Sequence, residues 1–287
     1  MDSIKKIAIQ GVSGAFHEIA SRTYFEGETL EIVQCITFND LFDALEFGQA
    51  DYGVIAIENS LVGSIIPNYA LLRESKLKIL GEIFLRIEQH LMVSKGEKLE
   101  DIKEIYSHPM AIEQCLDFLK PFRRSGVRIL DSEDTALSAK RIADNSLKGV
   151  GAIASHLAAE MYNLEIICPS IETNKKNFTR FLVISSEKNY QTLNKEKPLN
   201  KASLCFRLPH EEGSLSQVLS VLAFYKINLS KIKPNKVTKW IKYHGVDDHE
   251  MLKTFNCGVG FCIIADKKNY KKILKVFNNS TKPYEIG

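Results

Sequence analysis

Apolar residues in the first 186 positions alternate between short β-rich runs and segments with helical spacing. Runs rich in Val, Ile and aromatic residues predict strands, and apolar residues three or four positions apart predict helices between them. Such alternation indicates a parallel or mixed sheet covered by helices. The expected strands are 7–10, 31–37, 53–57, 104–107, 127–131, 151–154 and 178–184, and the expected helices are 16–25, 41–47, 112–118 and 136–145.

These elements form two blocks, one before about residue 81 and one from about 103 to 167, joined by the apolar stretch 83–93. We therefore expect two lobes, and small ligands commonly bind in a cleft between lobes. A strand at 178–184 is left over at the end. The fold class expected for this part is α/β.

The pattern changes after residue 186. Residues 187–200 are polar and nearly devoid of aliphatic side chains, so we expect a linker there. From 201 to 287 the pattern predicts a small α+β module of a size suited to regulation. Its expected strands are 202–208, 227–232 and 257–265, and its expected helices are 214–225 and 270–277.

Composition is that of an ordinary globular protein of about two domains, with 287 residues and 45% hydrophobic content. A net charge of +3 without a basic face argues against nucleic acid as a partner. The first residues lack a long apolar signal region and no run reaches membrane-spanning length, so we expect a cytoplasmic protein without a membrane partner. Six scattered cysteines without a Cys-x-x-Cys pair argue against a zinc site or disulfides, so no metal is expected.

Polar residues gather at the ends of the expected strands. Glu58, Asn59 and Ser60 leave the apolar run 52–57 together, which alone would indicate a turn and a helix cap. Open α/β sheets place ligands at such junctions, so we expect the groups to share a cleft. The other junctions carry Ser13, Ser107, His108, Asp134, Ser155 and the segment from Asn177 to Phe181.

Several of these positions have two interpretations. The turn at residues 11–16 is either a backbone anion site or a tight turn. His108 is a candidate base, although a His before Pro is more often a turn residue. Cys115 fits an apolar core better than a nucleophile. Arg180 could hold a carboxylate through two hydrogen bonds or form a surface salt bridge, and it should face away from Thr179 if the strand is regular.

With these residues in hand, the chain resembles the prephenate dehydratase family over essentially its whole length. The matching motifs are GVSGAFHEIA, IENSLVGSI, YSHPMAIEQC, AAEMYNLEII and NFTRFLVI, followed by a module that looks like an ACT domain. The resemblance implies a two-lobed catalytic domain similar to periplasmic binding proteins at 1–186 and an α+β ACT (ferredoxin-like) domain at 201–287. It also implies decarboxylating dehydration of prephenate to phenylpyruvate, CO2 and water in phenylalanine biosynthesis, without a cofactor.

The resemblance also supplies candidate site residues. Thr179 is the expected essential residue and candidate proton donor. Because an alcohol is a weak acid, it would need a relay through Glu58, a relay through water, or a polarising arrangement in which aromatisation supplies most of the driving force. One departure is Thr173, where the family usually has Asp. The expected substrate-binding residues are Asn59, Ser60, Ser13, Ser107, Gln114, Asn177, Arg180 and Phe181.

The C-terminal module resembles a phenylalanine-binding regulator in one motif and departs from it in another. Gly213, Ser214 and Leu215 match the family's Gly-Ala-Leu motif, and Asn228 precedes the second effector motif. There the family's Glu-Ser-Arg-Pro reads Lys-Pro-Asn-Lys from Lys233 onward. We expect an effector, phenylalanine or another amino acid, with altered feedback, and a homodimer or homotetramer because ACT modules pair.

Two other functions fit the same residues. Arogenate dehydration differs only in a substrate side chain that bears an ammonium instead of a keto group. A non-catalytic cytosolic sensor of small ligands could use the same two-lobed clamp, although it would not need the Thr-Arg-Phe set of residues 179–181.

Overall fold

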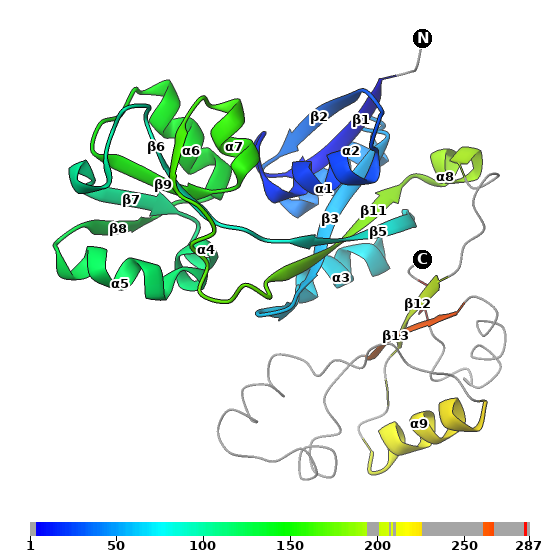
Figure 1. Cartoon of the computed structure of the whole chain (residues 1–287). Helices are drawn as coiled ribbons and strands as arrows, with labels where there is room; N and C mark the ends of the chain where they lie inside the picture. Colours follow the sequence, from blue (N-terminus) through cyan, green and yellow to red (C-terminus); the bar gives the residue numbers. More distant parts are fainter. Residues whose placement is uncertain are drawn as a thin grey trace. The chain divides into compact units, whose positions relative to one another are not determined.

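The computed structural model describes residues 4–193, 201–206, 208, 211–225, 261–266 and 284–285. The chain divides into two compact units, Met1–Asn68 with Gly81–Ser186, and Tyr69–Leu80 with Glu187–Gly287. The first unit contains two lobes, each built on one sheet (Figure 1). This arrangement confirms the predicted α/β class for this part of the chain.

The first lobe is a six-stranded sheet in the order β2-β1-β3-β11-β5, with β4 beside β3. Strand β1 is parallel to β2 and β3, whereas β11 is antiparallel to β3. Helices α1 (Phe16–Tyr24) and α2 (Phe38–Glu46) pack on this sheet. The strands are β1 (Lys5–Gln10), β2 (Leu30–Cys35), β3 (Tyr52–Asn59), β4 (Gly63–Ser64), β5 (Lys78–Arg86) and β11 (Phe178–Ser185).

Strand β3 lies at the centre of this sheet, and all eight of its residues are buried. Its apolar sequence explains this position. A central strand is covered on both faces, and the residues before Glu58 are apolar, so their burial removes no polar side chain from water. Glu58 and Asn59 therefore enter the protein interior as the last two residues of a core strand. Helix α3 (Ile66–Glu74) follows after β4.

The second lobe is a five-stranded sheet in the order β10-β6-β9-β7-β8. Helices α4 (Pro109–Gln114) and α5 (Leu116–Arg124) contribute to one apolar cluster, and α6 (Thr135–Asp144) and α7 (His156–Met161) contribute to another. A 3-10 turn, η1 (Leu99–Asp101), precedes β7. The strands are β6 (His90–Val93), β7 (Glu104–Ser107), β8 (Arg128–Asp131), β9 (Val150–Ala154) and β10 (Glu165–Cys168).

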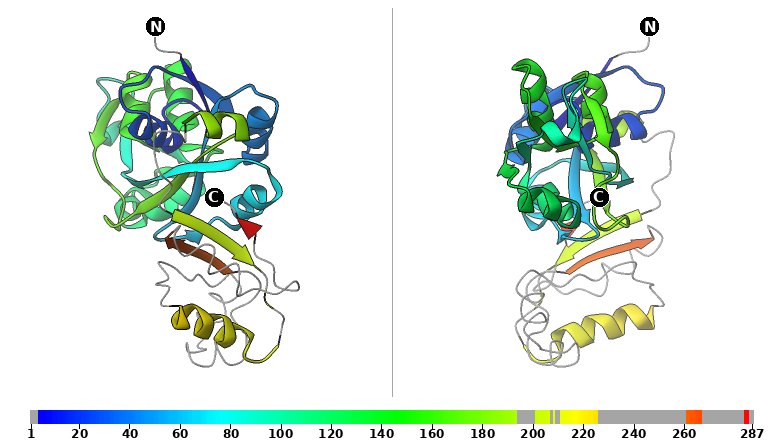
Figure 2. Two further views of the ribbon diagram at one scale, coloured as in Figure 1. Left: turned by 90° about the vertical axis from the view of Figure 1, so that its right-hand side faces the viewer. Right: turned by 60° about the vertical axis from the view of Figure 1, so that its left-hand side comes forward.

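The chain crosses between the lobes twice, from β5 to β6 and from β10 back to β11. Figure 2 shows the cyan strand β5 and the yellow-green strand β11 on this path. The lobes also meet at the first turn, where Ser155 Oγ donates to Gly14 O at 2.6 Å and Tyr162 Oη donates to Ser13 O at 2.7 Å. A Cβ on Gly14 would lie 2.8 Å from Ala158 Cα, so only glycine permits this approach.

Several elements differ from the sequence prediction. The apolar stretch 83–93 divides into the end of β5 and all of β6, and the pattern did not indicate β4 or β10. Helix α8 (Glu187–Leu193) occupies the first half of the expected linker. The sequence pattern did not predict α8, because its residues are mostly polar and form no apolar stripe.

In the second unit the structure describes one three-stranded antiparallel sheet, in the order β13-β12-β14, and helix α9 (Ser214–Phe224). The strands are β12 (Lys201–Phe206), β13 (Phe261–Asp266) and β14 (Tyr284–Glu285). The expected strand 227–232 and helix 270–277 lie outside the described residues, so the ACT fold stays a prediction. Within the described ranges, no helix is both long and apolar enough to cross a bilayer.

Candidate functional site

The end of β3 lies against the start of β11. In this antiparallel pair Asn59 is opposite Thr179 and Glu58 is opposite Arg180. Neighbouring residues of a strand point to opposite faces, so the four side chains separate into two pairs. Asn59 and Thr179 occupy one face, and Glu58 and Arg180 occupy the other.

Asn59 is held in one amide orientation by the backbone that follows it. Its Oδ1 accepts from the N–H groups of Leu61 and Val62 at 2.9 and 3.0 Å, which is a local turn of the kind that Asn favours. Its Nδ2 therefore points the other way and donates to Asn177 Oδ1 at 2.7 Å and to Thr179 Oγ1 at 3.0 Å. The turn expected from the sequence thus also orients the site.

The hydrogen bonds continue into the second lobe. Asn177 Nδ2 donates to Oε1 of Gln114, the last residue of α4, at 2.9 Å. We call Gln114, Asn177, Asn59 and Thr179 the amide network. Asn59, Asn177 and Thr179 are buried, whereas Gln114 is half-buried. In the interior each such bond is worth more than in water, and the network fixes its members' rotamers.

The segment before β11 supports Gln114 from its backbone. Thr173 N donates to Gln114 O at 2.8 Å, and Thr173 Oγ1 accepts from Asp117 N at 3.2 Å near the start of α5. The hydroxyl of Thr173 thus contacts a free amide of a helix start, a position that a carboxylate could also fill. Thr173, which stands where the family usually has Asp, therefore still provides an oxygen acceptor for Asp117 N.

Arg180 lies in an ionic cluster on the opposite face of β11. Its Nε donates to Glu82 Oε2 at 2.7 Å and its Nη2 lies 2.6 Å from the same oxygen. Its Nη1 is 4.0 Å from Glu58 Oε2, and Phe84 lies under the guanidinium at 6.0 Å. We call Glu58, Arg180 and Glu82 the ionic cluster. Glu58 is opposite Arg180 in the β3–β11 pair and Thr179 is opposite Asn59, so the relay between Glu58 and Thr179 stays a prediction.

Phe181 continues β11 into the core. It is 1% exposed and packs edge-on against His17 of α1, with ring centroids 5.1 Å apart. A register shift between Arg180 and Phe181 marks an irregularity at this point of the β3–β11 pair. His17 Nε2 accepts from Ala56 N at 3.4 Å, and burial lowers the pKa of His17 to about 4. Its imidazole is therefore neutral at pH 7.

The other expected substrate-binding residues do not join the amide network. Ser107 Oγ donates to Ile153 O at 2.6 Å inside the second lobe. Ser60 is exposed, and its Oγ donates to Lys176 O and accepts from Phe178 N, which extends the pairing of β3 with β11. Ser13 Oγ accepts from Gln34 Nε2 at 2.8 Å at the turn where the lobes meet.

In the turn at residues 11–16, a carboxylate of this chain already accepts a backbone hydrogen bond. Gly14 N donates to Oε2 of the buried Glu18 at 2.8 Å, and Arg22 pairs with Glu18 Oε1. A carboxylate of the same helix therefore occupies the amide that an anion would need, which favours the tight-turn interpretation.

The alternative candidates have structural roles. His108 Nδ1 accepts from Met110 N, and Asp134 Oδ1 accepts from Leu137 N, so both cap helices. Cys115 is fully buried, and burial raises the pKa of its thiol to about 12, which excludes a thiolate nucleophile at neutral pH. No group of His, Cys, Asp and Glu in the described ranges could hold a metal ion.

The effector candidates belong to the second unit. Gly213 has a positive φ of 81° and precedes Ser214, the first residue of α9. Ser214 and Leu215 are buried. Asn228 lies outside the described residues.

Two residues of this region had no signal in the sequence. Glu82 lies within β5, and Gln89 follows it on the segment that crosses to β6. Glu82 reaches the site because β5 lies beside β11, and Gln89 reaches it because the two segments that cross between the lobes meet there. Strand order is a non-local property that periodicity does not contain.

Comparison with known proteins agrees with this architecture. A family model described as prephenate dehydratase matches residues 7–189. The chain is 38% identical to arogenate dehydratase 2 of Petunia hybrida, covering 82% of this chain and 57% of the relative. It is 34% identical to the bifunctional chorismate mutase/prephenate dehydratase of Aquifex aeolicus, covering 82% of this chain and 63% of the relative. The chain thus spans about three fifths of the length of these relatives.

Solved structures show the same fold. Prephenate dehydratase from Staphylococcus aureus is similar with a TM-score of 0.69 at 25% identity, covering 98% of each chain. The enzyme from Arthrobacter aurescens in complex with L-Phe has a TM-score of 0.74 at 22% identity, covering 98% of this chain and 89% of that one. GqqA, described as a quorum quenching acylase, has a TM-score of 0.75 at 26% identity, covering 99% and 97%.

The family model covers more than half of the chain, and the two relatives match four fifths of it at more than 30% identity. The chain therefore belongs to the prephenate dehydratase family.

Proposed function

We propose that the chain catalyses the decarboxylating dehydration of prephenate to phenylpyruvate, CO2 and water. The observation that carries this proposal is the amide network, which ends on the hydroxyl of Thr179 and spans both lobes. Membership of the family supports the same reaction.

The reaction needs one proton and one directed flow of electrons. The bond between the ring and one carboxylate breaks, its electron pair enters the ring, and the C–O bond to the ring hydroxyl breaks on the far side. Hydroxide is a poor leaving group, so a donor must stabilise it as it departs and water forms when it takes a proton. Aromatisation of the ring supplies most of the driving force.

Thr179 is the donor in this proposal. Its Oγ1 already accepts from Asn59 Nδ2, so its own hydrogen is free to point at another acceptor. Asn59 cannot turn its oxygen towards Thr179, because that oxygen accepts from Leu61 and Val62. The network therefore presents an O–H donor to the leaving hydroxyl. An alcohol is a weak acid, so water replenishes the proton.

The retained carboxylate and the keto group are held by neutral donors. Gln114 Oε1 faces Asn177, so the two hydrogens of Gln114 Nε2 are available to substrate. Arg180 is engaged by Glu82, and we assign it with Glu58 to positioning β11. Binding the substrate through its retained carboxylate suits the reaction, because strong binding of the departing carboxylate would stabilise the ground state and slow its loss.

The test is to incubate the purified protein with prephenate while phenylpyruvate and CO2 are followed. Release of both in equal amounts supports the proposal. Binding of prephenate without turnover would instead identify a sensor that uses the same clamp.

Arogenate is the second candidate substrate, because arogenate dehydratase 2 is 38% identical to this chain. It differs from prephenate by an ammonium in place of the keto group. Comparison of kcat/KM for the two substrates decides between them. The acylase activity ascribed to GqqA needs a nucleophile beside a base, and within the described residues neither Thr179 nor Ser107 has a histidine partner.

We further propose that the C-terminal module is an ACT domain that binds phenylalanine or another amino acid and pairs two or more copies of the chain. The match at Gly213 to Leu215, at the start of α9, supports this regulatory role. A cytoplasmic location stays a prediction.

A further inference from the structure

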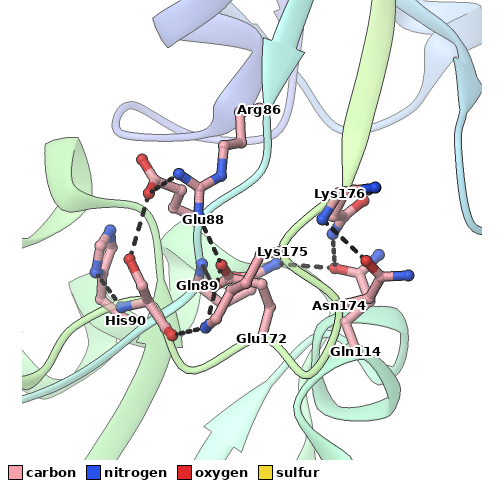
Figure 3. Close-up of polar contacts among 11 residues, drawn as sticks. Arg86, Glu88, Gln89, His90, Gln114, Glu172, Asn174, Lys175 and Lys176 are labelled. Carbon is pink, nitrogen blue, oxygen red and sulfur yellow. Dashed lines mark hydrogen bonds and ion pairs between the residues drawn. The ribbon is translucent and has the colours of Figure 1, made fainter.

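Gln89 lies on the segment that crosses from β5 to β6 and is 2% exposed. Its backbone is fixed on both sides: Gln89 N donates to Oε2 of the buried Glu172 at 3.0 Å, and Gln89 O accepts from Ile171 N at 2.7 Å. Figure 3 shows Gln89 between Glu172 and Gln114. The path of this segment therefore does not depend on the Gln89 side chain.

The side chain of Gln89 reaches the amide network at its second-lobe end. Gln89 Nε2 donates to Gln114 Oε1 at 3.3 Å, and the same oxygen accepts from Asn177 Nδ2 at 2.9 Å. Two donors on one carbonyl oxygen use both of its lone pairs. They fix Gln114 with its oxygen towards the network and its NH2 group away from it.

The orientation of the Gln89 amide has a cost. Its Oε1 is buried without a hydrogen-bond partner among the described residues. Leaving a buried acceptor unsatisfied costs roughly 1–3 kcal/mol of folding free energy. Turning the amide over would place two carbonyl oxygens against each other, so the observed orientation keeps the donor on Gln114. A buried polar group left in such a position needs a reason beyond packing.

We propose that Gln89 is a positioning residue that locks the Gln114 amide so that its NH2 group is presented to substrate. This inference rests on the proposed function, which it deepens by adding a residue that acts through Gln114. Without Gln89, Gln114 keeps one hydrogen bond from Asn177 and its amide can rotate about that contact.

The test is a double-mutant cycle of Gln89→Met and Gln114→Met, since Met keeps the length of Gln without its amide. We expect Gln89→Met to lower kcat/KM about tenfold, mainly through KM, as is usual for a group that orients a ligand-binding residue. In the Gln114→Met background the same change should have no further effect. Equal losses in both backgrounds would overturn the inference. Thermal unfolding of each variant separates a loss of stability from a loss of positioning.

A second readout does not depend on the reaction. The side-chain amide signals of Gln114 in a ¹H–¹⁵N spectrum are identified by their loss in Gln114→Met. We expect them to move towards the values of a solvated glutamine in Gln89→Met, and unchanged signals would refute the positioning role. If wild type turns over neither prephenate nor arogenate, the proposed function fails, whereas this spectrum still judges Gln89.

Discussion

Replacing Thr179 by Val tests the centre of the proposed mechanism, because Val has the same shape and lacks the hydroxyl. The change removes the donor that we assign to the leaving group and the acceptor of Asn59 Nδ2. A positioned donor of this kind contributes about 10² to 10⁴ in rate. We therefore expect kcat to fall by at least about 10², which is roughly 2.7 kcal/mol of barrier.

The same substitution has a separate cost in stability. Asn59 is buried, and one hydrogen of its Nδ2 would lose its acceptor while the other still reaches Asn177. An unsatisfied buried donor costs about 1–3 kcal/mol. For a unit of this size, each kcal/mol lowers Tm by about 2–4 °C, so the variant should remain folded at 25 °C.

Steady-state rates at saturating prephenate and a thermal melt measure both effects. Thr179→Ser is the matched control, since it keeps the hydroxyl and should lose much less activity than Thr179→Val. A Val variant with near-normal kcat would remove Thr179 from the reaction and return the network to a purely structural role.

Three further predictions concern stability and regulation. Arg180→Met should lower the free energy of unfolding by about 3–5 kcal/mol in urea titrations, because it removes the buried cation that contacts Glu82 and lies near Glu58. A loss below about 1 kcal/mol would show that the cluster is solvated. Burial lowers the pKa of His17 from 6.5 to about 4. The contribution of neutral His17 to the free energy of unfolding should therefore be complete above pH 6.5, and as pH falls towards 4 up to about 3 kcal/mol of it should be lost. His17→Gln keeps an acceptor for Ala56 N and should flatten that part of the pH–stability curve; identical curves would disprove the assignment. Since Lys233 replaces a family acid, phenylalanine should inhibit weakly, and tight calorimetric binding with strong inhibition would contradict this expectation.

Local patterns predicted much of the first unit. Strand 104–107 begins and ends as expected, and β3 and β11 extend the expected strands by one or two residues at their ends. The opposite facing of Thr179 and Arg180 also followed from strand geometry. These features depend on residues close in sequence, where side-chain periodicity is informative.

The features of the candidate site that the sequence did not predict depend on contacts between residues far apart in the chain. The role that we propose for Arg180 differs from the one expected from the sequence, because β5 lies beside β11 and brings Glu82 to the guanidinium. Gln89 was missed because a single glutamine in an apolar stretch resembles any surface residue. Only the crossing of the two inter-lobe segments brings it to Gln114.

The position of β11 between β3 and β5 also sets an order for folding during synthesis. All five strands of the second lobe come from one continuous stretch, from His90 to Cys168, so that lobe can form as soon as this stretch has left the ribosome. The sheet of the first lobe must wait for Phe178–Ser185, although its other strands are made earlier. Until then β3 and β5 lack their common neighbour, and the nascent chain exposes two unpaired strand edges, which are the kind of surface on which chains aggregate.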